Sequence, residues 1–421
     1  MTSASPLDEI CRPLKQCRIC GKKDLVRFLD LGPMLLVNRY LTSTDLHQPE
    51  PKFPLEILFC RSCFLSQLSV VISPQILYAN YAYHSSISKT FQEHCEKMAN
   101  DLARTLDLGE QDLILEIASN DGCLLSYFKT FGSKVLGVEP AHNLAQIAKS
   151  KGLRTITRFW DQSVADDVVM QYGKARLVLA TNVLAHVDDL HGFLRAVASV
   201  LKPDGVFVFE VPYMVNFMNR AEFDTAYHEH LSYFLLHPLK IALEKNGFVL
   251  ADVHEFEIHG GSIRLMATRG GSLPGTGAEN IQRLLNWEEE LGLHVESSYL
   301  RFASHVALLK EELTVFLRAL KIRDKKIAAY GASAKGNVLL NYCGIGRDLL
   351  EYVVDDTPAK QGKFYPGNHL PIVSRTHLHD IPPHYLLLLA WNFVDEMVKN
   401  TAQFREKGGR YIVPIPSLRV I

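Results

Sequence analysis

Short apolar runs alternate with amphipathic segments through the middle of the chain. Leu113–Ile117 has the length of a buried strand, a helical pattern begins at Leu124, and a second apolar run, Lys134–Val138, ends at Glu139 and Pro140. Strand, helix and strand in this order predict the opening βαβ unit of a parallel sheet that binds a dinucleotide or a nucleoside. A carboxylate at the end of the second strand can accept hydrogen bonds from both ribose hydroxyls.

The pattern of the last strands shows which of two cofactor classes, a dinucleotide or SAM, this sheet is expected to bind. Residues 201–205 predict a tight turn before the strand at 205–212, and the apolar runs at 248–258 and 262–268 are joined by Gly260 and Gly261. Strands with so short a connection must pair antiparallel. Such a terminal hairpin is typical of methyltransferases that use S-adenosylmethionine (SAM). The phosphate-binding motif G-x-G-x-x-G of dinucleotide sites is missing, which agrees with a cofactor that has no pyrophosphate.

The cofactor is expected at the carboxyl ends of these strands, where ligands bind in open α/β sheets. The loop from Ala118 to Gly122 follows the first strand, and Asn182 and His186 follow the fourth. A lone histidine there is nearly as often a packing residue. The residues predicted to bind the cofactor are Glu116, Ala118, Asn120, Gly122, Glu139, Pro140 and Asn182.

A second α/β unit follows a helical stretch at 275–325, with strands predicted at 326–330, 352–356, 385–389 and 411–413. The spacing of Gly331 and Gly336 imitates a P-loop, but Asn337 stands where the lysine should be, so we reject an NTPase. Backbone amides, Ser333 and Lys335 are expected to hold a phosphate at the helix N-terminus. The predicted substrate-binding residues are Ser333, Lys335, Asn337, Asp355, His259 and Arg264.

Two C-x-x-C pairs lie near the N-terminus of the chain. Cys17 and Cys20 form one pair, and Cys60 and Cys63 form the other. Two such pairs complete a tetrahedral sulfur cage for Zn²⁺, and four protein ligands make the site structural rather than catalytic. The alternative, two redox disulfides, suits a cytoplasmic chain less well. Cys11 is expected to be an unligated neighbour.

The fold class predicted from these patterns is α/β with three parts. They are an N-terminal zinc module at 1–75, a central SAM-methyltransferase domain of Rossmann-like type at 76–272, and a C-terminal second Rossmann-like domain at 273–421. The chain is 47% hydrophobic with a net charge of -1, so it has no electrostatic footprint for nucleic acid or an anionic membrane. No secretory signal or membrane-spanning run is recognised. We expect a cytoplasmic monomer.

The segment from Asp224 to Tyr233 carries the densest group of chemically active side chains. Tyr227, His228, Glu229 and His230 follow a strand end, where a ligand is expected. Histidine has an unperturbed pKa suited to proton abstraction near neutral pH. The segment therefore predicts a catalytic base cluster, although histidine and glutamate also decorate solvated loops. The tyrosines of the connector at 78–83 either seal a domain interface or line the mouth of a pocket.

Several motifs together resemble the nucleotide-sugar C-methyltransferases, including the C-3′-methyltransferases of deoxysugar pathways. They are the paired C-x-x-C head, EIASNDG, GVEPA, NVLAHV, YHEHLSY, HGGSIR, GASAKGN and YVVDDTPAKQG, and they cover essentially the whole chain. The resemblance implies SAM as methyl donor and a nucleotide-linked (dTDP or GDP) 4-keto-6-deoxy sugar as acceptor. The family usually has glycine where Ala118 stands, so a methyl group here narrows the approach of the backbone to the cofactor.

The resemblance also implies the roles of individual residues. The histidine that ends the YHEH motif, His230, is the expected base, and Tyr227, Glu229 and His186 are expected beside it in the active site. A tyrosine of the connector, Tyr81 or Tyr83, joins them. The sequence leaves open a SAM-dependent O- or N-methyltransferase of another small molecule, and a non-enzymatic zinc scaffold or nucleic-acid adaptor. Neutral charge and the intact Glu139 argue against the scaffold.

Overall fold

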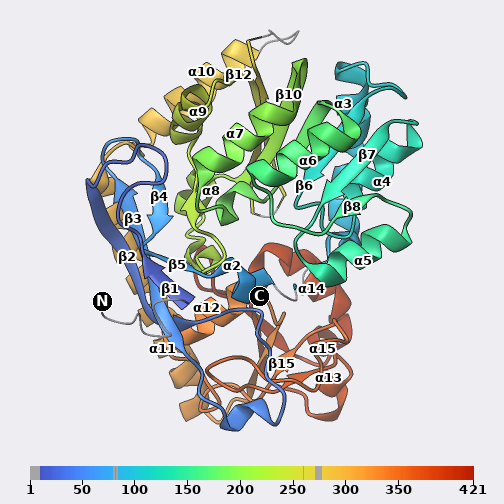
Figure 1. Cartoon of the computed structure of the whole chain (residues 1–421). Helices are drawn as coiled ribbons and strands as arrows, with labels where there is room; N and C mark the ends of the chain where they lie inside the picture. Colours follow the sequence, from blue (N-terminus) through green and yellow to red (C-terminus); the bar gives the residue numbers. More distant parts are fainter. Residues whose placement is uncertain (1–9, 79–80, 82–83, 259, 271–276) are drawn as a thin grey trace, which may run out of the picture.

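A seven-stranded sheet forms the centre of the fold, in a computed structural model that describes residues 10–78, 81, 84–258, 260–270 and 277–421 (Figure 1). The strand order is β12-β13-β10-β9-β6-β7-β8, with β13 antiparallel to both of its neighbours. This confirms the predicted terminal hairpin. The strands are β6 (Leu113–Ile117), β7 (Lys134–Val138), β8 (Thr155–Ile156), β9 (Ala175–Thr181), β10 (Leu201–Pro212), β12 (Val249–Phe256) and β13 (Ser262–Thr268).

Both faces of the central sheet are covered by helices, as its near-continuous apolar strands require. Phe207 and Phe209 of β10 enter one apolar cluster, whereas Val206 and Val208 enter another on the opposite face. This alternation follows from the two-residue period of a strand. The helices of this domain are α3 (Lys89–Thr105), α4 (Cys123–Thr130), α5 (His142–Ser150), α6 (Gln162–Tyr172), α7 (Leu190–Val200), α8 (Met214–Asn219) and α9 (Leu236–Lys245).

One prediction about this sheet is wrong. Residues 201–205, expected as a free turn, belong to the span of β10 and pair with β9 through Leu201. The register shifts between Leu201 and Val206, so the Pro203-containing stretch is an irregularity within a strand. A bulge of this kind accommodates a residue that cannot donate a ladder hydrogen bond.

The N-terminal module carries a four-stranded sheet of order β11-β4-β3-β2 and a two-stranded sheet of β1 and β5. Its helix α2 (Pro74–Tyr78) leads into the connector. The strands are β1 (Cys11–Pro13), β2 (Leu25–Leu35), β3 (Lys52–Cys60), β4 (Ser66–Leu68), β5 (Val70–Ile72) and β11 (Ser232–Tyr233). The last of these comes from the central domain and begins two residues after His230, so the two parts share one sheet.

The C-terminal domain has a six-stranded sheet of order β16-β15-β14-β17-β18-β19. Its long helix α11 packs on β2, where Tyr299 contacts Phe28 and Phe59 at ring-centroid distances of 4.9 and 4.3 Å. The strands are β14 (Ile327–Tyr330), β15 (Val353–Val354), β16 (Ile372–Val373), β17 (Tyr385–Leu388), β18 (Arg410–Val413) and β19 (Arg419–Val420). The helices are α10 (Gly277–Glu290), α11 (Glu296–Ile322), α12 (Ala334–Cys343), α13 (His377–Asp380), α14 (Val394–Asn400) and α15 (Ala402–Glu406).

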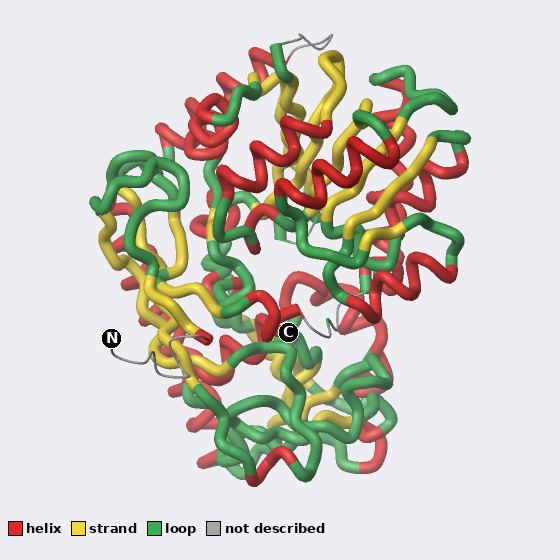
Figure 2. The backbone as a smooth tube through the Cα atoms, viewed as in Figure 1, coloured by secondary structure: helices red, strands yellow, loops and turns green. Residues whose placement is uncertain are grey.

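The three parts surround a common centre, with the N-terminal module at the left of Figure 2, the central domain above and the C-terminal domain below. No helix among the described residues is long and apolar enough to cross a membrane.

The four paired cysteines come together as predicted. Their sulfur atoms all lie within 4.8 Å of one another, with 3.4 Å between those of Cys17 and Cys63 and 3.5 Å between those of Cys20 and Cys60. Zinc in a tetrahedral thiolate site has Zn–S bonds of about 2.3 Å, which places the sulfurs about 3.8 Å apart. The donor set and its spacing therefore fit Zn²⁺.

Both C-x-x-C loops fold in the same way. Gly21 and Phe64 directly follow the second cysteine of each pair, and their φ angles are +75° and +65°. Gly21 donates its backbone N–H to the Cys17 carbonyl at 3.0 Å, and Phe64 donates to the Cys60 carbonyl at 2.8 Å. These turns hold two thiolates of each pair on one side of the chain.

We expect one zinc per chain by metal analysis. Cys60→Ser should lose the metal and lower the melting temperature, because a structural zinc site contributes folding free energy. Activity should fall only in proportion to the fraction of chain that remains folded. Cys11→Ser is the matched control: Cys11 is half-buried in β1, outside the cluster, so this variant should keep its zinc. A metal-free wild-type protein would contradict the assignment.

Candidate active site

A cavity of about 600 Å³ lies where the three parts meet. It collects side chains that are far apart in the sequence. The lining includes Asn38 and Tyr40 of the N-terminal module, Tyr78, Tyr81, Glu116, Ala118, Asn120, Glu139, Pro140, Asn182, His186, Tyr227 and His230, and, from the C-terminal domain, Ser333, Lys335 and Lys360.

The predicted cofactor loop forms one end of the cavity, between β6 and α4. Ala118, Asn120 and Gly122 have φ angles of +57°, +51° and +76°. A left-handed conformation costs a residue with a side chain about 1–2 kcal/mol, which explains why glycine is the usual residue at position 118. Gly122 is also enclosed, because a Cβ there would lie 2.2 Å from the side chain of Leu153.

Glu139 holds this loop in place from the end of β7. Its two carboxylate oxygens accept the backbone N–H of Asn120 and that of Ala141, each at 2.8 Å. Burial raises the pKa of Glu139, while the two amide bonds act in the opposite direction. Each oxygen keeps a second lone pair toward the cavity, so the carboxylate fits its predicted role on a ribose diol.

Glu116 and Asn182 supply further polar groups near the loop. Within the described residues, Glu116 Oε2 and Asn182 Oδ1 are buried without a hydrogen-bond partner, and both residues line the cavity. Burial and the neighbouring Cys123, Glu139 and Asp121 raise the pKa of Glu116 well above its ordinary value. Buried polar atoms normally have partners, so these two fit a ligand that brings donors, such as the ammonium group of SAM.

His230 is placed as a base would be. Its Nδ1 lies 2.9 Å from the carbonyl oxygen of Thr225, and its ring lies against that of Tyr227 with 4.1 Å between centroids. A carbonyl oxygen only accepts, so Nδ1 carries the hydrogen, and in the neutral ring the lone pair is on Nε2. His230 lines the cavity, whereas its neighbour His228 bonds to the Pro54 carbonyl at 3.1 Å on the far side.

His186 is less suited to take a proton. Its ring centroid lies 5.0 Å from that of His230, and its Nδ1 lies within hydrogen-bond distance of the Tyr78 hydroxyl, at 2.8 Å. Burial lowers the pKa of His186 to about 4, so the ring is neutral at pH 7. In a neutral imidazole one ring nitrogen donates and the other accepts, so the direction of the Tyr78 bond depends on which nitrogen of His186 carries the hydrogen. Tyr78 lines the cavity and belongs to the aromatic connector, whose tyrosines were expected at a domain interface or at a pocket mouth; only Tyr81 and Tyr83 were given an expected place in the active site.

Glu229 lies behind the cavity wall. Its carboxylate accepts the amide Nδ2 of Asn38 at 3.0 Å and the hydroxyl of Tyr81 at 3.3 Å. Burial raises the pKa of Glu229 to about 7, against the lowering effect of these two hydrogen bonds. Asn38 comes from the N-terminal module, and no local sequence pattern predicts its contact with Glu229.

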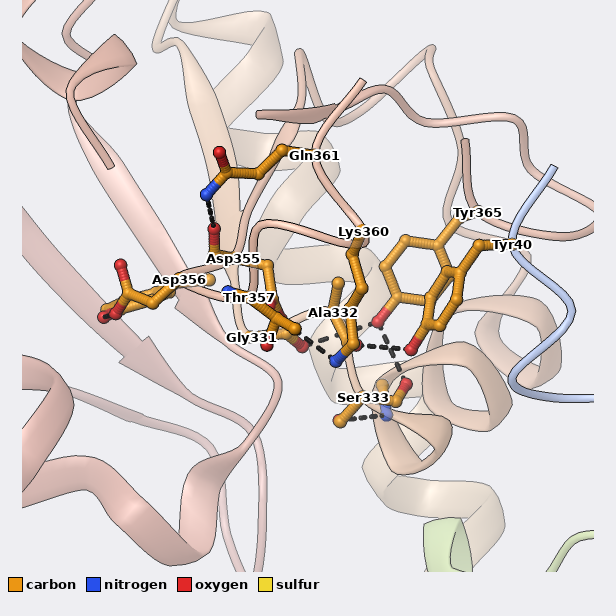
Figure 3. Close-up of polar contacts among 12 residues, drawn as sticks. Tyr40, Gly331, Ala332, Ser333, Asp355, Asp356, Thr357, Lys360, Gln361 and Tyr365 are labelled. Atoms are coloured by element: carbon orange, nitrogen blue, oxygen red, sulfur yellow. Dashed lines mark hydrogen bonds and ion pairs between the residues drawn. The ribbon is translucent and has the colours of Figure 1, made fainter. Parts of the chain in front are cut away.

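The opposite end of the cavity is the N-terminus of α12. Figure 3 shows Tyr40, Lys360 and Tyr365 converging on the 331–333 loop, with the Lys360 ammonium 2.7 Å and the Tyr40 hydroxyl 2.6 Å from the Ala332 carbonyl. Ser333 caps the helix by accepting the N–H of Gly336 at 3.1 Å. The first amides of a helix have no intrahelical partner and attract anions.

Lys335 lies at the same end of the cavity. Its Nζ is buried, has no hydrogen-bond partner among the described residues, and stands 4.9 Å from the centroid of the Trp391 ring. An ammonium group in this state fits an acceptor supplied by a ligand.

Some predicted residues do not line the cavity. Arg264 does not reach it, because its Nε is engaged by the buried Glu210 at 2.6 Å. Asn337 is buried and donates to the Pro366 carbonyl, and Asp355 accepts the N–H of Thr357 and contacts Lys360. None of these three side chains lines the cavity. Tyr83 and His259 lie outside the described residues.

Comparison with protein-family models gives three matches in succession along the chain. "Putative zinc binding domain" matches residues 17–78, "Methyltransferase domain" matches 90–253, and "C-methyltransferase C-terminal domain" matches 257–416. The C-methyltransferase NovU of Streptomyces niveus is 36% identical over 419 residues, which are 99% of both chains. The chain belongs to the C-methyltransferase family of NovU. This confirms the resemblance found in the motifs.

More distant relatives match smaller parts of the chain. A ubiquinone biosynthesis O-methyltransferase of Rhodopseudomonas palustris (strain TIE-1) is 27% identical over 114 residues, 27% of this chain and 45% of that protein. The solved structure of magnesium protoporphyrin IX methyltransferase (ChlM) from Synechocystis PCC 6803 with bound SAH covers 47% of this chain and 92% of its own, at 16% identity and a TM-score of 0.34. As a member of the NovU family, the chain is a SAM-dependent C-methyltransferase with a zinc-binding module.

Glu139→Ala should weaken SAM binding by about 1.5–3 kcal/mol, the range for hydrogen bonds to a charged group. The variant removes both the acceptor for the ribose and the anchor of the loop. Isothermal titration calorimetry with SAM measures the change. Asp166→Ala, which removes an exposed carboxylate on α6, should bind SAM normally. Unchanged affinity in Glu139→Ala would refute the assignment.

Proposed function

We propose that this enzyme methylates C-3′ of a nucleotide-linked 4-keto-6-deoxy sugar, in deoxysugar biosynthesis. The single observation that carries the proposal is the orientation of His230, whose Nδ1–H is bound by the Thr225 carbonyl in a cavity that also holds the cofactor loop. The family motifs support the sugar as acceptor. Cytoplasmic location and a monomeric state remain predictions.

The reaction begins with loss of a proton from carbon. A ketone at C4 acidifies the neighbouring C–H bonds, because the resulting carbanion is delocalised as an enolate. His230 Nε2 takes the proton, and the imidazolium that forms keeps its Nδ1 bond to Thr225. Glu229 and Tyr227 are the residues we expect to orient the base or to hold the sugar.

The enolate oxygen requires hydrogen-bond donors where its charge develops. We expect such a donor to come from the neutral His186 ring, from the Tyr227 hydroxyl or from a tyrosine of the connector, which compete for the role. SAM supplies an electrophilic methyl group on sulfur. The nucleophilic carbon would take this methyl group in line, aided by proximity and alignment, as the S–CH₃ bond breaks and S-adenosylhomocysteine leaves. His230 then releases its proton to solvent.

The nucleotide part of the substrate is proposed to lie on the C-terminal domain. The open amides at the start of α12, together with Ser333 and Lys335, present a positive end for a diphosphate, and Lys360 stands beside them. This arrangement accepts a diphosphate from either dTDP or GDP. An O- or N-methyltransferase needs no carbon base, so exchange of a carbon-bound hydrogen separates it from the proposed reaction.

His230→Asn should reduce turnover by about 10²–10⁴, the usual contribution of a positioned general base. Asparagine keeps roughly the shape but cannot accept the proton, so both ligand affinities should stay within a few fold. With S-adenosylhomocysteine in place of SAM, the variant should also lose exchange of the sugar hydrogen with deuterated water. NMR of the exchanged sugar distinguishes C3 from C5, the other carbon next to the ketone.

His228→Asn is the matched control, because His228 faces Pro54 and Phe53 and not the cavity. The folded control should retain turnover within a few fold. Normal turnover and normal hydrogen exchange by folded His230→Asn would remove His230 as the base.

Lys335→Ala should weaken binding of the nucleotide sugar at least tenfold, because a buried charge-assisted contact to phosphate is lost. SAM binding should be unchanged, since the cofactor loop is at the other end of the cavity. Calorimetry with each ligand alone separates the two effects. Lys399→Ala, on α14, is a control outside the cavity lining. Equal weakening of both ligands by Lys335→Ala would contradict the proposed division of the site.

A further inference from the structure

Asn38 links the zinc-bearing module to the catalytic end of the cavity. We propose that Asn38 is a positioning residue whose hydrogen bond favours the ionised form of Glu229, and that in this form Tyr81 offers an oxygen acceptor, and not a proton donor, to the bound substrate. The inference deepens the proposed function and rests on it for the identity of the substrate.

The position of Asn38 is set by the fold of the N-terminal module. It follows β2, has a φ angle of +64°, and lines the cavity together with Tyr40. Asparagine tolerates this left-handed conformation better than most residues. Its Nδ2 reaches Glu229 Oε1, which is 191 residues away in the sequence, at 3.0 Å.

Glu229 is buried and receives one donor on each carboxylate oxygen. Asn38 donates to Oε1, and the Tyr81 hydroxyl donates to Oε2. Two donors suit the ionised form, which only accepts. Burial raises the pKa of Glu229 to about 7, and both hydrogen bonds lower it from where burial alone would put it. Without the Asn38 amide, the pKa of Glu229 would be higher, and a larger fraction of this carboxyl group would be protonated at neutral pH.

The charge of Glu229 fixes the direction of the Tyr81 hydroxyl. Burial and the Glu229 charge raise the pKa of Tyr81 well above 10, so its hydroxyl keeps its one hydrogen. While Glu229 is ionised, that hydrogen points to Oε2, and the lone pairs of the phenol face the cavity. If Glu229 were protonated, it could donate to Tyr81, and the phenol hydrogen would turn toward the ligand.

This polarity restricts the substrate. An acceptor in the cavity wall selects a ligand group that donates, which means a hydroxyl or amino group on the sugar near the reacting carbon. A ketone, an enolate or a phosphate oxygen cannot fill that role. Tyr81 therefore recognises a substituent, and the enolate oxygen is left to the donors His186 and Tyr227.

Other polar and titratable groups also face Glu229. They act on it through charge, through ring contact or through the Glu229 backbone. They are Tyr40, Tyr78, His186 and Tyr227, with His228 and His230 as chain neighbours.

The decisive variant is Asn38→Gly, because glycine keeps the left-handed backbone and removes only the side chain. Loss of one hydrogen bond to a charged group should move the Glu229 titration upward by about one to two pH units. The kcat/KM for the acceptor should fall about tenfold at pH 6.5 and approach the wild-type value at pH 9. SAM affinity should not change. Asp324→Gly, at an exposed turn with a φ angle of +52°, is the matched backbone control and should match wild type at both pH values.

A second measurement needs no substrate. Infrared difference spectra between pH 5 and 9 should contain a carboxyl band that Glu229→Gln lacks, and its midpoint should rise in Asn38→Gly. In the Glu229→Gln background, Asn38→Gly should cause no further change in the pH profile, since the group that it acts on is gone. A midpoint that stays in place, or a loss of rate that is uniform from pH 6 to 9, would overturn the role of Asn38. A shifted midpoint in a chain that does not methylate the keto sugar would leave the linkage intact and reject the proposed substrate.

Discussion

The active site depends on the hydrogen bonds made by the backbone of Leu231. Its N–H donates to the Ala185 carbonyl at 2.7 Å, and its carbonyl accepts the N–H of Leu68 at 3.0 Å and the guanidinium of the buried Arg18 at 3.2 Å. Arg18 stands between the two cysteines of the first C-x-x-C pair. One residue thus joins the central domain, the N-terminal sheet and the first C-x-x-C loop, and the next residue toward the N-terminus is His230. The zinc module shapes the catalytic segment through backbone hydrogen bonds.

Burial sets the electrostatic character of the cavity. His186 is held neutral, while Glu229 and Glu222 have pKa values raised to about 7. A carboxyl group with a pKa near 7 is easily neutralised, so its burial costs little free energy. In a medium of low dielectric constant, its pKa responds strongly to a single hydrogen bond. The same environment strengthens every donor aimed at a developing enolate. Charge is concentrated at the far end, around Lys335 and Lys360, where the anionic part of the proposed substrate would lie.

Much of this organisation can be predicted from the sequence, because it depends on local patterns. The order of strands, the terminal hairpin, the cysteine cluster and the loop at Ala118 follow from periodicity, turn residues and spacing. The contacts that complete the site do not. The pairing of β11 with β4 and the bond from Asn38 to Glu229 depend on how distant segments meet. Arg264 looked available for a ligand because its buried partner Glu210 lies on the neighbouring strand.

The shared sheet of the first two parts has a consequence for protein engineering. Ser232 and Tyr233 supply an edge strand to a sheet whose other strands all come from the first 75 residues. A chimera that takes its head from one relative and its body from another must therefore recreate a backbone pairing across the junction, in register. Exchange of the C-terminal domain meets a different barrier, the aromatic contact of Tyr299 with Phe28 and Phe59. The three sequence segments that match separate family models are therefore not segments that can be exchanged independently between relatives.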